Sequence, residues 1–159
     1  ASGCAPTVKD YGHLLRHDRE YSDRANRLAE KAQDISEFIE RQDLEPLRGN
    51  GADEALIAFH SPCTLQHGLQ RNGKVEQLLA GLGFRLTPVR NAHLCCGSAG
   101  TYSILQKKLS NQLLQQKLAC LEEKQPDLIA TANIGCMMHL QGGTNLPVRH
   151  WIELLADRA

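Results

Sequence analysis

The sequence predicts an α/β domain: a layered parallel sheet of three to four strands, with flanking helices and with cysteines at the carboxyl edge of the sheet. Short apolar runs, typical of strands buried on both faces, alternate with longer segments whose apolar residues recur at helical spacing. Prolines and glycines separate the two kinds of segment. Strands that alternate with helices pair in parallel through right-handed crossovers, which gives this fold class.

The composition limits the class of molecule. The chain has 159 residues, enough for a compact domain with a core, and 42% of them are hydrophobic. Eighteen basic residues balance eighteen acidic ones, which argues against nucleic acid as the partner because phosphate binding leaves a basic footprint. No apolar run approaches the roughly 20 residues that span a bilayer, so we expect no transmembrane segment.

The N-terminal third is expected to be helical. Residues 8–41 have helical periodicity, with a break near His17 and Asp18. One face is apolar and the opposite face is a solvated, charged one. The apolar positions are Ala25, Leu28, Ala32, Ile35 and Ile39. A loop at Pro46, Gly49, Asn50 and Gly51 then leads into the first strand.

Strands and helices alternate in the rest of the chain. Strands are expected at residues 55–60, 84–89, 127–132 and, as an edge strand, 146–148. Helices are expected in two parts around Asn72 and Gly73, at about 101–123, in a short segment through Leu140, and at 150–158. In the long helix the side expected to be buried carries Leu105, Leu109, Leu113, Leu118 and Leu121. Cys120 in that helix is interpreted as a packing residue.

Four other cysteines occupy equivalent places. Cys63, the pair Cys95 and Cys96, and Cys136 each follow a strand and precede a helix, with 31 residues between Cys63 and Cys95 and 39 between Cys96 and Cys136. Such turns meet at the carboxyl edge of a parallel sheet, so these thiols are expected to converge. Helix N-termini are expected to lower the thiol pKa values and to favour the thiolates that bind metal. The sequence therefore predicts a metal centre, iron–sulfur or zinc.

Two glycines beside the cysteine pair are expected to belong to the cofactor site. Gly97 and Gly100 permit positive φ angles and a close approach of the backbone, and an irregular backbone is needed for Cys95 and Cys96 to share one site.

The histidines near the thiols leave alternatives open. His139 lies three residues after Cys136 on the same helix face, so it is either a fifth metal ligand, a hydrogen-bonding neighbour of the site, or a surface residue. His60 and His93 are interpreted as neighbours of the thiols or as ordinary surface histidines. Met137 and Met138 are interpreted as packing residues.

Two other uses of the cysteines are less favoured. The six cysteines could form three disulfides, but disulfide-dense chains are usually small and core-poor. A thiol–disulfide enzyme using Cys95 and Cys96 would lack a Cys-x-x-Cys motif, and a disulfide between neighbours is strained.

The cysteine pattern resembles the CCG cysteine-rich domain family over about residues 55–150. The segments that carry the resemblance are His60-Ser61-Pro62-Cys63, His93-Leu94-Cys95-Cys96-Gly97-Ser98-Ala99-Gly100 and Ala132-Asn133-Ile134-Gly135-Cys136. Members include a cysteine-rich component of heterodisulfide reductase and the iron–sulfur subunits of glycolate oxidase and related 2-hydroxy-acid dehydrogenases. The amino-acid sequences of these segments are most similar to the C-terminal part of the iron–sulfur subunit of glycolate oxidase.

The resemblance implies an iron–sulfur electron-transfer subunit of a glycolate or 2-hydroxy-acid oxidase complex, not catalytic by itself. It implies a [4Fe–4S] cluster on Cys63, Cys95, Cys96 and Cys136, with zinc as the alternative. Electrons would pass from a flavin-containing hydroxy-acid dehydrogenase subunit toward a quinone-type acceptor. It also implies a cytoplasmic location, or one at the inner face of the cell membrane through the complex. The alternative function is a structural zinc domain for subunit docking.

Two departures from the family pattern stand out. Where the family has Cys-x-x-Cys, this chain has Cys136-Met137-Met138-His139. The segment Ser2-Gly3-Cys4 resembles the end of a preceding motif, which implies that residues 1–50 are the helical tail of a truncated first CCG domain and that residues 51–159 form the second. By that interpretation Cys4 is separated from its own partners.

Overall fold

A four-stranded sheet forms the centre of the computed structural model, which describes residues 2–49 and 55–159. The strands are β1 (Leu56–His60), β2 (Arg85–Leu86), β3 (Leu128–Thr131) and β4 (Val148–His150). Their order is β2-β1-β3-β4, and every neighbouring pair is parallel. The predicted α/β fold is confirmed, and the fourth strand lies at an edge as expected.

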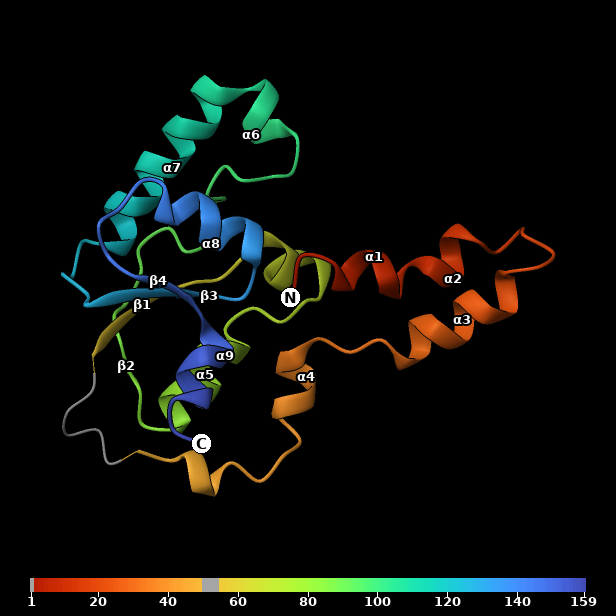
Figure 1. Ribbon diagram of the computed structural model, residues 1–159, viewed down its shortest axis with the longest axis horizontal. Coiled ribbons are helices and arrows are strands. Elements are labelled where there is room, and N and C mark those ends of the chain that lie inside the picture. Colours follow the sequence, from red (N-terminus) through yellow and green to blue (C-terminus); the bar gives the residue numbers. More distant parts are fainter. Residues whose placement is uncertain (1, 50–54) are drawn as a thin grey trace.

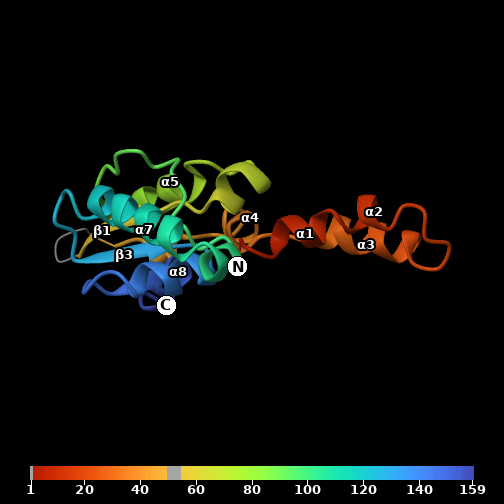
Figure 2. The same cartoon turned by 90° about the horizontal axis from the view of Figure 1, so that it is seen from above.

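Two helical layers cover the sheet (Figure 1). On one face lie α7 (Lys107–Leu121) and α8 (Ile134–Gln141), and on the other α5 (Lys74–Gly81) and α9 (Trp151–Ala156). Each layer has its own core, one around Trp151 and Leu79, the other around Leu114 and Leu118. Seen from above, α7 and α8 lie on either side of β3 (Figure 2).

The register decides which side chains reach which layer. Ala58 is paired with Ile129, and two residues further along His60 is paired with Thr131. Because alternate residues of a strand point to opposite faces, His60 and Thr131 lie on the same face as Ala58 and Ile129. Ala58 and Ile129 pack in the core beneath α7 and α8. His60 therefore points toward the α7 and α8 layer at the carboxyl ends of the strands.

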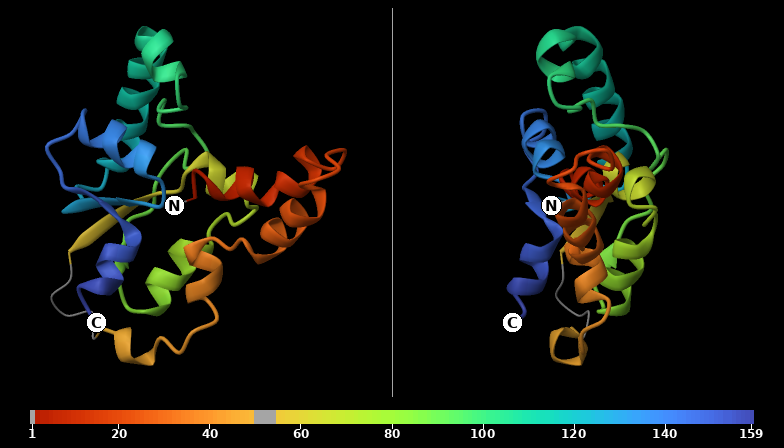
Figure 3. Two further views of the ribbon diagram at one scale, coloured as in Figure 1. Left: turned by 45° about the vertical axis from the view of Figure 1, so that its right-hand side comes forward. Right: turned by 90° about the vertical axis from the view of Figure 1, so that its right-hand side faces the viewer.

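The N-terminal segment is helical and is interrupted near His17 and Asp18 as predicted, but it is also interrupted at Asp10 and after Lys31, so it forms several short helices instead of two. The helices are α1 (Ala5–Lys9), α2 (Tyr11–Leu14), α3 (Ser22–Lys31) and α4 (Ile35–Ile39). Asp34 starts α4 as an N-cap that accepts from the backbone of Ser36, and a chain that enters a new cap cannot continue the preceding helix. The pair α2 and α3 projects away from the sheet (Figure 3).

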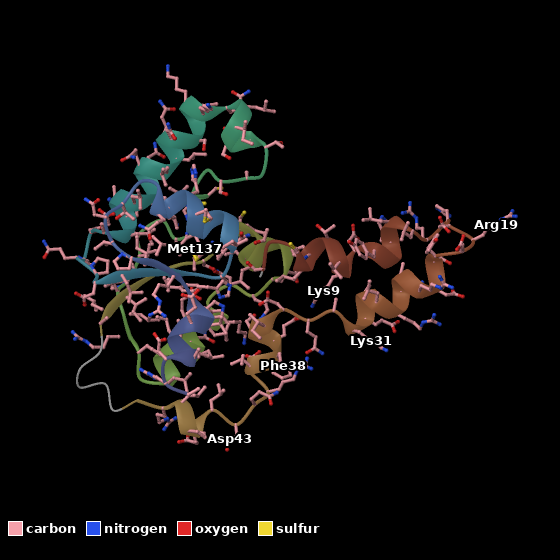
Figure 4. The ribbon with its side chains drawn as sticks, viewed as in Figure 1. Lys9, Arg19, Lys31, Phe38, Asp43 and Met137 are labelled. Carbon is pink, nitrogen blue, oxygen red and sulfur yellow. The ribbon has the colours of Figure 1, made fainter. Side chains whose placement is uncertain are left out.

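The projecting arm is joined to the rest at its base. Lys9 reaches from α1 toward α4 (Figure 4), where its Nζ lies 2.7 Å from Oε1 of Glu37. Leu28, expected on the apolar face, is 50% exposed, whereas Ala25 is buried and Ile35 and Ile39 pack against the core of the α5 and α9 layer. A short 3-10 helix, η1 (Glu45–Leu47), follows. The predicted loop residues Asn50 and Gly51 lie outside the described residues.

The helix expected at 101–123 is divided. It consists of α6 (Tyr102–Leu105) and α7, which meet at Gln106, where φ is −117° and ψ is 47°. Leu105 and Leu109 are exposed, contrary to expectation. Leu118 and Leu121 are buried as expected, and the buried side of α7 also carries Ser110, Leu114, Lys117 and Cys120. The break turns α7 so that Ser110 and Lys117 face the sheet, and the expected burial of Cys120 is confirmed.

Candidate metal centre

The candidate site lies where β1 and β3 end. Cys63 follows β1 and starts η2 (Thr64–Gly68), a short π-helix, while Cys136 is the third residue of α8, which follows β3. Cys95 and Cys96 lie in the loop between β2 and α6. The predicted placement of cysteines after three strands is thus observed, although five residues separate Cys96 from the start of α6.

The four thiols form a continuous chain. Cys63 is in hydrogen-bond contact with Cys95, Cys95 with Cys96, and Cys96 with Cys136. Exposure falls along the chain, since Cys63 is exposed, Cys95 is half-buried, and Cys96 and Cys136 are buried. The structure therefore brings together all four cysteines that the sequence singled out. Their role as metal ligands stays a prediction.

A cavity of about 690 Å³ opens beside the thiols. All four line it, together with the expected fifth ligand His139 and with Gly100. Cys4 also lines this cavity, although the sequence interpretation separated it from partners. Ser2 holds that segment in place, because its backbone N–H and its hydroxyl both donate to the carbonyl of Ala132 at 3.1 Å.

The pKa values of Cys63, Cys95 and Cys96 are raised, contrary to the expectation from helix N-termini. Burial raises the pKa of Cys63, with the neighbouring Cys95 as the next cause. The hydrogen bond with Cys96, followed by burial, raises the pKa of Cys95 well above its ordinary value. The hydrogen bond with Cys136 raises the pKa of Cys96 to about 12. Crowded, partly desolvated thiols resist forming several thiolates together, and this effect exceeds that of the helix ends.

Backbone N–H groups partly offset this rise in the thiol pKa values. The N–H of Gly97 donates to Sγ of Cys95 at 3.3 Å, and the backbone N–H groups of Thr64 and Ser98 donate to Cys63 and Cys96. Hydrogen bonds to the charged form of a thiol favour that form. Once a metal replaces the protons, the same donors would stabilise the bound thiolates.

The glycines behave as expected in their backbone angles. Gly97 has a φ of 93° and Gly100 a φ of 55°. A Cβ at Gly97 would lie 2.5 Å from the carbonyl oxygen of Ser110, so α7 packs directly on this loop. A Cβ at Gly100 would meet nothing within 4 Å. Glycine is therefore required at Gly97 by both angle and space, and at Gly100 by angle alone.

His60 is part of the site, which the sequence left undecided. It is 1% exposed, and one of its ring nitrogens and the Sγ atoms of Cys96 and Cys136 all lie within 4.8 Å of one another. Burial, followed by the nearby charge of Lys117, lowers the pKa of His60 to about 3, so the ring is neutral. His93, in contrast, is exposed.

His139 lies in the cavity wall and is hydrogen-bonded to α7. Its Nε2 is 3.2 Å from Oγ of Ser110, whose hydroxyl donates to the carbonyl of Gly97 at 2.9 Å. Because that hydroxyl has a single proton, Nε2 of His139 is the donor in this contact. Met138 is 68% exposed at the rim, so its interpretation as a packing residue is wrong, whereas Met137 packs on the core.

Lys117 is a buried cation beneath the site that the sequence did not reveal. Its side chain is fully buried, and its Nζ donates to the carbonyls of Asn91 and Ala92, which precede the cysteine pair. Burial lowers the pKa of Lys117, whereas the nearby thiols of Cys120 and Cys96 raise it. A single lysine among leucines in a helix gave no signal of this position.

These features define a cysteine-rich α/β domain whose thiols gather at the carboxyl edge of a parallel sheet. Comparison with known proteins supports this description of the domain. The chain belongs to the CCG cysteine-rich domain family, which residues 57–141 match. The match includes all four clustered thiols and both His60 and His139.

Similar proteins carry related names. The chain is 47% identical over 155 residues to the glycolate oxidase iron–sulfur subunit of Escherichia coli (strain K12), covering 98% of this chain and 38% of that protein. It is 31% identical to lactate utilization protein A of Anoxybacillus flavithermus and 30% identical to that of Bacillus licheniformis, in each case covering 99% of this chain and 68% of the relative. The chain thus spans well under half of the first relative and about two thirds of the others.

Proposed function

We propose that this chain carries the metal centre of an iron–sulfur subunit in a hydroxy-acid oxidase complex, with glycolate or a similar 2-hydroxy acid as the substrate of the complex. The observation that carries the proposal is the continuous chain of Cys63, Cys95, Cys96 and Cys136 beside one cavity. The names of the relatives, a glycolate oxidase iron–sulfur subunit and lactate utilization proteins, support it.

The donor set fits a [4Fe–4S] cluster. Thiolate sulfur is the ligand that such clusters take from proteins, and four cysteines are the usual number. A bound cluster would supply one-electron transfer. The chain's own contribution is to hold four thiolates, to donate backbone N–H groups to three of the sulfurs, and to place the cation of Lys117 beneath them.

The partner in this proposal is a flavin-containing dehydrogenase subunit that oxidises the hydroxy acid. The sequence has no complete dinucleotide-binding fingerprint, since Gly97-Ser98-Ala99-Gly100 lacks the third glycine. Electrons would leave this chain toward a quinone-type acceptor. None of the helices in the described part of the chain is both long and apolar enough to cross a membrane. The location that accompanies this proposal, as the family resemblance implies, is the cytoplasm or the inner face of the cell membrane through other subunits.

The test is the metal and acid-labile sulfide content of anaerobically purified protein. Iron and sulfide near four per chain, with a brown colour that bleaches on reduction, would support the electron-transfer function. Iron without sulfide would contradict the cluster.

A second candidate function is a structural zinc domain for subunit docking. The observation that favours it is the mixed nitrogen and sulfur set of His60, Cys96 and Cys136, because zinc is commonly held by histidine and cysteine together. One zinc per chain and no sulfide would support it. In that case removal of zinc by a chelator should lower the unfolding temperature, since structural zinc contributes folding energy.

A further inference from the structure

The imidazole of His60 is buried without a partner. It is 1% exposed, and neither Nδ1 nor Nε2 has a hydrogen-bond partner among the residues that the structure describes. Buried polar side chains almost always have a partner, because burying one without it costs on the order of 1–3 kcal/mol. Because both ring nitrogens of His60 lack a hydrogen-bond partner, we expect another atom, from a bound ion or ligand, to contact the ring.

The surroundings of His60 contain donors for a metal. One ring nitrogen and the Sγ atoms of Cys96 and Cys136 lie within 4.8 Å of one another, and all three residues are buried. In a tetrahedral site with bonds of about 2.0–2.3 Å, ligand atoms lie roughly 3.5–3.8 Å apart. Small side-chain rotations would bring these three atoms to that separation.

The backbone holds His60 firmly in this place. It is the last residue of β1 and is paired with Thr131 of β3 in the centre of the sheet. The hydroxyl of Thr131 is also buried without a partner in the described chain. Two neighbouring polar side chains thus lie on the same face of the sheet, at the level of the inner thiols.

A neutral ligand suits the inner end of the site. Four thiolates carry four negative charges, and charge is costly where Cys96 and Cys136 are buried. An imidazole nitrogen binds metal without adding negative charge.

We infer that His60 binds the metal centre through a ring nitrogen, beside Cys96 and Cys136, and serves as the ligand that replaces the absent second cysteine of the Cys-x-x-Cys pair. His139 stands at that sequence position, but its Nε2 is engaged with Ser110 on α7. The inference rests on the proposed metal centre, for iron–sulfur or zinc alike.

Pulsed electron paramagnetic resonance can detect a directly bonded nitrogen. The protein is prepared with 15N-labelled histidine and examined in its reduced cluster form, or with Co²⁺ in the site if the native metal is zinc. The strong 15N coupling of a bonded imidazole should be present in the unmodified protein and in His139→Ala. It should be absent in His60→Leu and in His60→Cys, while His60→Cys keeps a metal content close to that of the unmodified protein.

The matched control is His93→Leu, which changes an exposed histidine and should retain the coupling. Circular dichroism verifies that each variant is folded. If His60→Leu does not fold, the loss of nitrogen coupling is measured in His60→Cys alone. Coupling that disappears in His139→Ala and persists in His60→Cys would overturn the inference in favour of His139. Metal without nitrogen coupling would overturn it but leave the metal centre intact, and an unmodified protein that binds no metal would overturn both.

Discussion

Lys117 of α7 donates from Nζ to the carbonyl oxygen of Ala92 at 2.9 Å, so a buried cation holds the loop that leads into Cys95 and Cys96. Its second acceptor is the carbonyl of Asn91 at 3.2 Å, and no carboxylate of the described residues shares the contact. The ammonium is therefore not neutralised by these partners. Its charge is available to the thiolates that a metal would create above it.

Replacing Lys117 by methionine should lower the reduction potential of a bound cluster by tens of millivolts. A nearby positive charge favours the reduced, more negative state, and Lys117→Met removes it while keeping most of the volume. The measurement is a redox titration followed by absorbance. Lys124→Met, at an exposed position, is the control and should leave the potential unchanged. Equal potentials in Lys117→Met and the unmodified protein would contradict this role.

Cys96→Ser should lose the metal, because Cys96 links Cys95 to Cys136 in the chain of thiols. Cys120→Ser should keep it at a cost of about 1–2 kcal/mol, because Cys120 is buried in α7 outside that chain and a hydroxyl there needs a partner. Cys4→Ser should also keep it, because Cys4 lines the cavity but is absent from the thiol contacts of the described residues. Elemental analysis measures the metal content of the three variants. Equal metal loss in all three would refute the assignment of Cys96 as a metal ligand.

Gly97→Ala should destabilise the protein by roughly 2–4 kcal/mol. The substitution forces a side chain into a φ of 93° and places its Cβ 2.5 Å from the carbonyl oxygen of Ser110. Gly100→Ala has the open space that Gly97→Ala lacks and should cost only about 1–2 kcal/mol. Urea unfolding measures both values, and a smaller cost at Gly97 than at Gly100 would be inconsistent with this packing.

Glu37→Gln should lower stability by about 1 kcal/mol at neutral pH, because Lys9 and the backbone N–H of Asp34 both donate to the carboxylate. Burial opposes ionisation, but those hydrogen bonds and the nearby charges of Lys9 and Arg71 prevail and lower the pKa of Glu37. The folded pKa is below the unfolded one, so the contribution is complete above the ordinary value of 4.5 and disappears as the pH falls through the folded value.

Urea unfolding at pH 7 and at successively lower pH checks this dependence. The difference between Glu37→Gln and the unmodified protein should narrow as the pH falls below 4.5. Glu30→Gln, on the exposed side of α3, is the control and should differ little at either pH. A difference that grows on acidification would have the wrong sign.

The sheet and the gathering of thiols could be predicted because both depend on local patterns. Apolar runs such as residues 55–60 can be recognised without knowing their neighbours, and parallel strands bring their carboxyl ends to one edge whatever the loops contain. The same logic placed Cys63 beside Cys95 across more than thirty residues. The positive φ angles of Gly97 and Gly100 also follow from residue type alone.

The predictions that were wrong concern features that depend on tertiary contacts. Periodicity over residues 8–41 could not reveal the cap at Asp34, because a cap competes with helix continuation only when the chain turns. Within 101–123, the break at Gln106 rotated α7 and buried Lys117 in place of leucines. The pKa values of Cys95 and Cys96 are raised mainly by hydrogen bonds with neighbouring thiols, and those contacts form only in the folded chain.

Solvent exposure of the thiols decreases from Cys63 through Cys95 to Cys96, so the site has an outer and an inner end. A small oxidant that enters from solvent reaches Cys63 before it reaches the buried thiols. Among the four clustered thiols, oxidative damage should therefore proceed inward in a fixed order, beginning with sulfenic acid on Cys63. Early damage of that kind would leave the two inner thiols reduced, and a thiol reductant could still return the outer one to its starting state.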